Sequence, residues 1–257
     1  MSNALDRLRN NERALEAERR AMREALAWLE SSEKRIGAAR SPARLMIGLD
    51  LTGSRLARLE EARIAMAGML DVMKRVGRFA VKAVYYRGTC ECCETYRWFE
   101  DIDALCRMML ELHCESGPTQ IERILERALN ERETLSALVF IGDHCEEDAA
   151  HLKRLAAKLG EKSVPLFVFH ECADHDAPSL RAKPHFRAMA EASGGVYAEF
   201  RPDSGDALKE MLASIAAFSA QGFAGIERLA APETAPARRL REGLRLLPGS
   251  GKTTGGR

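Results

Sequence analysis

The sequence predicts a doubly wound α/β fold, in which a mostly parallel central sheet is flanked by helices, with a helical extension at the N-terminus. Two observations support this fold class. From residue 45 onward, short β-prone apolar runs alternate with helix-like runs, as in parallel sheets that helices cover on both faces. The first of these runs, LMIGLD at 45–50, has no polar face, which is typical of a strand buried on both sides.

Residues 1–40 form the predicted helical extension. Residues 3–36 are rich in Ala, Leu, Glu and Arg, contain no proline, and reach no glycine before Gly37. One row of apolar residues recurs every seven positions: Leu8, Leu15, Met22, Leu29 and Ile36. The second heptad positions, such as Asn11 and Glu18, are mostly polar, which argues against a strong two-stranded coiled coil. We therefore expect a helix that docks on its own domain or on a partner.

The domain that follows is expected over residues 41–222. Its predicted strands are 45–52, 80–87, 97–99, 136–142, 165–169 and 195–200. Its predicted helices are 55–76, 102–113, 119–131, 148–159, 179–192 and 207–220. The helix at 119–131, for example, places Ile121, Ile124 and Ala128 on one face.

The C-terminal residues 223–257 are predicted as a mostly disordered, basic tail. The segments APETAPARR and PGSGKTTGGR are rich in proline, glycine and charged residues, a composition that buries little apolar surface. One short helix is expected inside this tail, at 238–247.

Composition restricts the class of protein. The formal net charge is +1, but residues 41–225 carry 28 acidic and 23 basic side chains, which is not typical of a nucleic-acid-binding domain. No apolar run approaches the roughly 18–20 residues of a membrane helix, and the N-terminus lacks the apolar core of a signal peptide. Seven cysteines are best explained as reduced thiols. We expect a cytoplasmic protein, and its oligomeric state stays open.

Oxygen-bearing side chains collect at the predicted carboxyl ends of two strands. Asp50, Thr52 and Ser54 follow the first strand at alternate positions, and Asp143 follows the fourth. Thr119 opens the helix that precedes the fourth strand. Ligands of parallel sheets bind at this edge, and hard oxygen donors suit Mg²⁺, Mn²⁺ or Ca²⁺. Helix capping is the alternative explanation for each of these residues taken alone.

These motifs resemble the von Willebrand factor A (VWA) domain family and its metal-ion-dependent adhesion site. The resemblance covers residues 41–222. DLTGS at 50–54 corresponds to the family's Asp-x-Ser-x-Ser, Thr119 to its lone threonine, and Asp143 to the aspartate after the central strand. Thr52 stands in place of the commoner serine, and a threonine hydroxyl can still donate to the metal. Further segments are similar to a bacterial group of small VWA-domain proteins of unknown function: VYYRG, GPTQI, FIGDHCEE, PLFVF and ALKEMLASIAAF.

The resemblance implies a VWA/Rossmann-like fold with a metal site. In the family, hydroxyls usually contact the metal directly and aspartates often act through water. Thr52 or Ser54, together with Thr119, are therefore the expected direct ligands, while Asp50 and Asp143 hold charge and water. Mg²⁺ or Mn²⁺ is the expected ion, and Ca²⁺ fits less well. An acidic side chain of a protein partner would complete the metal shell, so the expected function is non-catalytic binding.

Two other functions fit part of the pattern. In the first, the chain is a structural scaffold with a vestigial metal site and binds its partner through the N-terminal helix. Loss of the partner in Asp50→Ala would favour the metal-dependent function, and retention would favour the scaffold. In the second, the metal is a Lewis acid for phosphoester hydrolysis, but the sequence offers no obvious general base, nucleophile or second metal site.

Two further motifs give weaker evidence for a ligand site. PGSGKTT at 248–254 resembles a phosphate-binding loop, but Leu246 stands where its first glycine is required, and no strand–helix unit surrounds it. The predicted loop at 88–96 contains a C-x-C-C sequence without a second ligand pair at standard zinc spacing. A zinc site remains a hypothesis there, formed by Cys90, Cys92 and Cys93 with His113 or His144.

Overall fold

The chain divides into two units, Met1–Ser41 and Pro42–Arg257. The computed structural model describes residues 42–58, 78–89, 91–94, 98–172, 175–201 and 205–247, all in the second unit. The predicted extension at 1–40 lies outside the described residues, as does most of the predicted helix at 55–76. The described start of that helix is a 3-10 turn, η1 (Gly53–Arg58).

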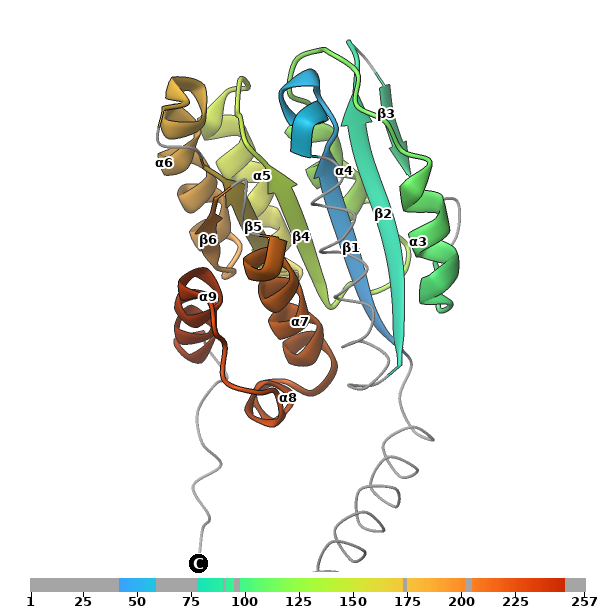
Figure 1. Cartoon of the computed structure of the whole chain (residues 1–257), viewed down its shortest axis with the longest axis vertical. Coiled ribbons are helices and arrows are strands. Elements are labelled where there is room, and N and C mark those ends of the chain that lie inside the picture. Colours follow the sequence, from blue (N-terminus) through green and yellow to red (C-terminus); the bar gives the residue numbers. More distant parts are fainter. Residues whose placement is uncertain are drawn as a thin grey trace, which may run out of the picture. The chain divides into compact units, whose positions relative to one another are not determined.

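One six-stranded sheet, in the order β3-β2-β1-β4-β5-β6, is the centre of the described unit (Figure 1). The strands are β1 (Ala43–Asp50), β2 (Phe79–Arg87), β3 (Glu91–Glu94), β4 (Ala137–Gly142), β5 (Leu166–Glu171) and β6 (Tyr197–Phe200). Neighbouring strands are parallel except β3, which pairs antiparallel with β2 at one edge. The predicted α/β class with a mostly parallel sheet is therefore confirmed.

Helices cover both faces of the sheet. They are α3 (Ile102–Leu110), α4 (Ile121–Leu129), α5 (Ala149–Glu161), α6 (Ala177–Ala192), α7 (Gly205–Gln221), α8 (Phe223–Arg228) and α9 (Ala235–Arg245). Leu45 and Ile47 of β1 pack in one core with α3, α7, α8 and α9. Met46 of the same strand packs in the other core with α4, α5 and α6. Strand β1 is therefore buried on both faces, because alternate side chains enter opposite cores.

The strand order reverses at β1, which has β2 on one side and β4 on the other. Both neighbours run parallel to β1, with Asp50 opposite Tyr86 and Leu49 opposite Ile141. Asp50 therefore ends β1 beside the end of β4, from which the chain continues into Asp143. Crevices at such switch points bind ligands in open α/β sheets.

Two segments differ from the prediction. The cysteine-containing loop at 88–96 includes the edge strand β3, and of the predicted strand 97–99 the described part shows one bridge, from Phe99 to Val81. Residues 223–247, predicted as mostly disordered apart from a short helix, form α8 and α9. Helix α9 has an apolar face of Ala237, Leu240 and Leu244 that packs in the core, a periodicity that the polar average composition conceals.

Glu210 fixes the start of α9 from α7. Its Oε2 accepts hydrogen bonds from the Thr234 backbone N–H (2.9 Å) and hydroxyl (2.5 Å), and its Oε1 accepts one from the Glu233 N–H (2.9 Å). Although partial burial acts to raise it, the pKa of Glu210 is lowered from its ordinary value of 4.5 by these hydrogen bonds and by the charge of Arg241. The ionised carboxylate is therefore the form that holds α9.

Glu210→Gln is expected to lower the free energy of unfolding by about 1–2 kcal/mol at pH 7, because the charge-assisted bonds are lost. A lowered carboxyl pKa stabilises the fold above the unfolded-state pKa of 4.5, and this contribution disappears as pH falls through the folded-state value. Urea unfolding at pH 7 and pH 3.5 should therefore show a difference from the parent that shrinks in acid. The exposed Glu227→Gln is the control; a pH-independent difference would contradict the prediction.

Among the described residues, no helix combines the length and apolar character required to cross a membrane.

Candidate functional site

The end of β1 forms a chain of hydrogen-bonded oxygens. Asp50 is almost fully buried, and its Oδ1 accepts hydrogen bonds from the Thr52 backbone N–H (2.8 Å) and hydroxyl (2.7 Å). The Thr52 hydroxyl oxygen lies 3.1 Å from the Ser54 hydroxyl oxygen. Because the Thr52 proton goes to Asp50, Ser54 donates to Thr52, and both hydroxyl oxygens keep lone pairs. The predicted Asp50, Thr52 and Ser54 thus form one continuous set.

Asp143 supplies the second carboxylate at this edge. Its side chain is fully buried, and neither carboxylate oxygen has a hydrogen-bond partner among the described residues. The Oδ2 of Asp50 also has none within this part of the chain. Burial and the neighbouring Asp143 charge raise the pKa of Asp50 from 3.8 to about 6. Three buried carboxylate oxygens without donors are costly unless a cation compensates them.

Thr119 is held by the loop that follows β4. Its hydroxyl donates to Glu147 Oε2 (2.5 Å) and accepts from the Glu146 N–H (2.9 Å), while its own N–H donates to Glu146 Oε2 (3.2 Å). One lone pair of the Thr119 hydroxyl is left for another ligand. Acidic residues just before a helix commonly favour its start, as Glu146, Glu147 and Asp148 could for α5. Only Asp148 caps α5, by accepting from the Ala150 N–H (3.0 Å).

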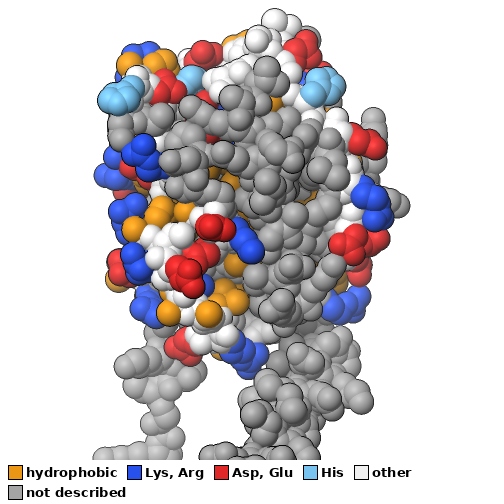
Figure 2. Space-filling model, viewed as in Figure 1, with side chains coloured by type: hydrophobic (Ala, Val, Ile, Leu, Met, Phe, Trp, Pro, Cys, Tyr) orange, Lys and Arg blue, Asp and Glu red, His pale blue; other side chains and the backbone are white. Residues whose placement is uncertain are grey.

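Loop contacts bring these groups to one edge of the sheet. The Glu115 N–H donates to the Leu51 carbonyl (3.0 Å), which joins the loop before Thr119 to the turn after Asp50. Tyr86, near the end of β2, has its pKa raised by burial, by the charges of Asp50 and Glu147, by the closeness of its hydroxyl to the Asp50 side chain, and by the charge of Asp143. In Figure 2, acidic and histidine side chains are visible at the upper end, where β1 and β2 end in the matching view of Figure 1.

A buried ion pair lies directly behind the oxygens. The Arg55 guanidinium is 2.7 Å from Glu171 Oε2, and both side chains are buried. Burial acts to lower the pKa of Arg55, but Glu171, Asp50 and Asp143 together raise it, so Arg55 stays charged. These three carboxylates and one guanidinium leave a formal charge of −2 when ionised. A divalent cation would neutralise that charge, and the unpartnered oxygens fit such an ion.

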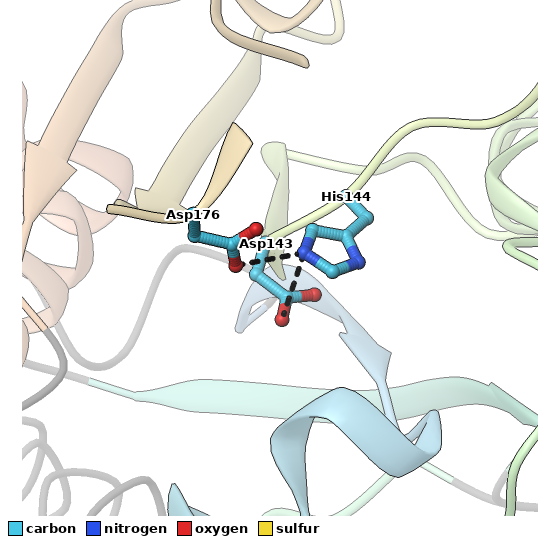
Figure 3. Close-up of side chains that lie close together, drawn as sticks. All are labelled: Asp143, His144 and Asp176. Carbon is cyan, nitrogen blue, oxygen red and sulfur yellow. Dashed lines mark hydrogen bonds and ion pairs between the residues drawn. The ribbon is translucent and has the colours of Figure 1, made fainter. Parts of the chain in front are cut away.

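A second group of possible ligands includes Asp143 (Figure 3). His144 Nε2 lies 2.9 Å from Asp176 Oδ2 and 3.8 Å from Asp143 Oδ2, and the three ligand atoms lie within 4.8 Å of one another. Asp176 also caps α6, through Oδ1 and the Ser179 N–H (3.4 Å). The sequence does not identify His144 and Asp176 as partners, because 32 positions separate them. Only the Asp-His pair in FIGDHCEE offered a signal.

His170 supports Asp143 from β5. Its Nε2 lies 3.2 Å from the Asp143 carbonyl and 2.9 Å from the Ser179 hydroxyl, and its Nδ1 lies 2.7 Å from the Tyr197 hydroxyl. Burial lowers the pKa of His170 from 6.5 to about 4. The ring is therefore neutral at pH 7, with Nε2–H as donor and Nδ1 as acceptor from Tyr197. This buried network fixes the backbone that presents the Asp143 carboxylate.

The alternative zinc ligands lie in different surroundings. His113 has both ring nitrogens near Arg87 Nη1, at 3.1 and 3.0 Å, and His144 faces Asp143 and Asp176. Cys90 and the side chains of Cys92 and Cys93 lie outside the described residues, as does the PGSGKTT segment. The cysteine-zinc hypothesis therefore stays a prediction.

Comparison with known proteins relates the fold to solved structures. No protein-family model matches the chain, and no curated protein matches it. A von Willebrand factor type A protein from Catenulispora acidiphila is 17% identical, with a TM-score of 0.55 over 70% of this chain and 43% of that one. BatB from Bacteroides thetaiotaomicron is 15% identical, with a TM-score of 0.53 over 73% and 100%.

Another similar structure is proximal thread matrix protein 1 from the mussel byssus with a zinc-occupied MIDAS motif. It is 13% identical, with a TM-score of 0.53 over 68% of this chain and 46% of that one. The chain thus spans less than half the length of the Catenulispora and byssus proteins. At these identities the likeness concerns the fold, and it confirms the predicted resemblance to VWA domains.

Proposed function

We propose that this chain is a non-catalytic module that binds a protein partner through a divalent cation. The cation is Mg²⁺ or Mn²⁺, and Asp50, Thr52, Ser54, Thr119 and Asp143 hold it. One observation carries the proposal: Asp50 Oδ2 and both Asp143 carboxylate oxygens are buried without hydrogen-bond partners among the described residues, at the switch point of the sheet. Buried carboxylates of this kind need a counter-charge.

The orientation of the hydroxyls supports their role as ligands. Thr52 and Thr119 each donate their proton to a carboxylate, to Asp50 Oδ1 and Glu147 Oε2 respectively. A hydroxyl that donates to a carboxylate directs its electron pairs elsewhere, where a hard cation can accept them. The carboxylates of Asp50 and Glu147 thus orient the hydroxyls, and Asp50 and Asp143 also supply charge and hold water.

The hydroxyl ligands of the proposed site are neutral, and this favours a partner with an acidic side chain. A divalent ion bound directly by hydroxyls and water keeps much of its positive charge at an open position. A carboxylate from another molecule fits that position better than a neutral group. Binding to a protein partner in general is in keeping with one similar structure, a pilus adhesin from Lactobacillus rhamnosus GG, which matches at a TM-score of 0.54 and 11% identity. We place the protein in the cytoplasm, in keeping with the free thiols of Cys145 and Cys172.

The test is calorimetric titration of Mg²⁺ and Mn²⁺ into the chelator-treated full chain. Asp50→Ala and Thr119→Ala are expected to weaken binding at least about 10–100-fold, since each removes a ligand or the group that orients one. Thr234→Ala is the matched control for Thr119, because its hydroxyl also donates to a glutamate (2.5 Å) at a helix start, that of α9. Thermal shifts at millimolar metal run in parallel, because an isolated site binds weakly.

The outcomes separate the candidate functions. Saturable binding that both site variants lose, and that Thr234→Ala keeps, supports the proposal and justifies a search for partners in the presence of metal. Equal binding in Asp50→Ala and the parent would overturn it. Absence of binding at any concentration would overturn the proposal and favour the scaffold that acts through the predicted N-terminal helix.

A further inference from the structure

The loop after β4 and the loop before α6 place three metal-binding side chains together. Asp143 is fully buried, while His144 and Asp176 are each about one-fifth exposed, with 19% and 23% of their side-chain surface accessible. In Figure 3, the Asp143 carboxylate and the Asp176 carboxylate both face the same ring nitrogen of His144. The cluster is therefore reachable from solvent on the side of His144 and Asp176, with Asp143 behind.

Helix capping explains only part of this arrangement. Asp176 needs only Oδ1 to cap α6, and its Oδ2 is the atom 2.9 Å from His144 Nε2. Asp143 has no capping role to account for its burial, because neither oxygen has a hydrogen-bond partner among the described residues. The Asp143 oxygens also face the hydroxyl site, but Oδ2 lies toward His144 Nε2 (3.8 Å), so a cation on the His144 side would compensate this buried carboxylate as well.

The donor set differs from that of the hydroxyl site. An imidazole nitrogen suits zinc and similar transition ions, whereas hydroxyl and carboxylate oxygens alone suit magnesium. In a tetrahedral site with bonds of about 2.0–2.1 Å, ligand atoms are about 3.3–3.4 Å apart. The separations from His144 Nε2, 2.9 Å to Asp176 and 3.8 Å to Asp143, lie on either side of that value. The three ligand atoms all lie within 4.8 Å of one another, close enough for one ion to contact them after side-chain adjustment.

We propose that Asp143, His144 and Asp176 form a second cation site, for a zinc-type ion, with Asp143 shared between this site and the hydroxyl site. Asp143 Oδ2 lies toward His144, which leaves Oδ1 for the ion held by the hydroxyls. Three protein ligands leave one position of a tetrahedral ion open for water or for a group from a partner. A bridging carboxylate would keep two cations close together at one edge of the sheet.

The site does not depend on the proposed binding function, since His144 and Asp176 take no part in the hydroxyl site. The ion would tie the loop after β4 to the start of α6, two segments that the His144–Asp176 contact and the His170 ring also join. Zinc-type and magnesium-type ions are therefore expected to bind to the chain together and not in competition. Asp143→Asn should weaken the binding of both.

The experiment titrates Zn²⁺ into the chelator-treated full chain and into three variants. His144→Ala and Asp176→Asn are expected to lower the affinity of one zinc equivalent at least about 10–100-fold. Asparagine keeps an oxygen for the α6 cap, so Asp176→Asn tests the charge and not the helix start. His151→Ala is the matched control, because its Nε2 lies 2.8 Å from Glu122 on the surface, in a histidine–carboxylate pair that has no third metal ligand among the described residues.

The same variants are titrated with Mg²⁺, and Asp50→Ala with Zn²⁺. Any zinc that cysteines bind elsewhere would be bound by all variants alike. The difference in zinc affinity between a variant and the parent therefore measures binding by Asp143, His144 and Asp176. Loss of zinc with retained magnesium in His144→Ala, and the reverse in Asp50→Ala, establishes two sites. Unchanged zinc affinity in both His144→Ala and Asp176→Asn, or non-saturable zinc binding by the parent, overturns the second site and leaves the hydroxyl site to its own test.

Discussion

Arg55→Met is expected to lower the free energy of unfolding by about 3–5 kcal/mol, measured by urea unfolding at pH 7.5 in chelator. The substitution removes a guanidinium that lies 2.7 Å from Glu171 and is 3% exposed. Asp50, Asp143 and Glu171 would then be buried close together without that positive charge. Breaking a buried pair from one side is costly, because the remaining charge keeps its desolvation penalty.

An exposed ion pair provides the matched control for Arg55. Arg78 and Glu100 are 3.3 Å apart, with 59% and 60% of their side chains exposed. Arg78→Met should cost at most about 1 kcal/mol, since water and salt screen such pairs. Saturating Mg²⁺ is expected to restore part of the stability of Arg55→Met, because a bound cation compensates Asp50 and Asp143. Equal costs for the two substitutions would refute the role assigned to Arg55.

The fold was largely predictable because its signals are local. Strand β1 contains an uninterrupted apolar run at 45–49, and alternate side chains enter the two cores as expected. Helices α3 to α7 begin within two residues of their predicted starts, because each has a periodic apolar face or a cap in its own sequence. Helix α9 was only partly predicted, since its charged residues outnumber the three apolar ones that are buried.

Only those parts of the candidate site that lie within a single strand end or loop could be predicted from the sequence. Asp50, Thr52 and Ser54 are linked through one short turn, and this can be inferred from their spacing. The pairs Arg55–Glu171 and His144–Asp176 join residues far apart in the chain. Arg55 and Glu171 belong to turns and strands that carry no special motif, so only the packing of β1, β4 and β5 identifies them as partners.

Gly117→Ala is expected to lower the free energy of unfolding by about 3 kcal/mol, the upper end of the usual cost of overpacking. A Cβ atom at Gly117 would lie 1.8 Å from the Gly88 carbonyl oxygen and 2.2 Å from its carbonyl carbon. Both are backbone atoms at the end of β2, and the Gly88 N–H donates to the Glu115 carbonyl (3.0 Å). The clash therefore cannot be relieved by a side-chain rotation.

The loop that carries Thr119 must consequently move, which gives this prediction a second readout. Thr119 lies two residues beyond Gly117, and its hydroxyl must stay near Glu147 to offer a lone pair to the ion. Mg²⁺ affinity should therefore fall at least about tenfold along with stability.

Gly194→Ala is the control, because Gly194 has φ +72° but no atom within 4 Å of the new Cβ. It should cost only about 1–2 kcal/mol of backbone strain and leave metal binding unchanged. If Gly117→Ala bound Mg²⁺ with the affinity of the parent, the affinity would not depend on the position of Thr119. Thr119 would then not be a ligand of the ion.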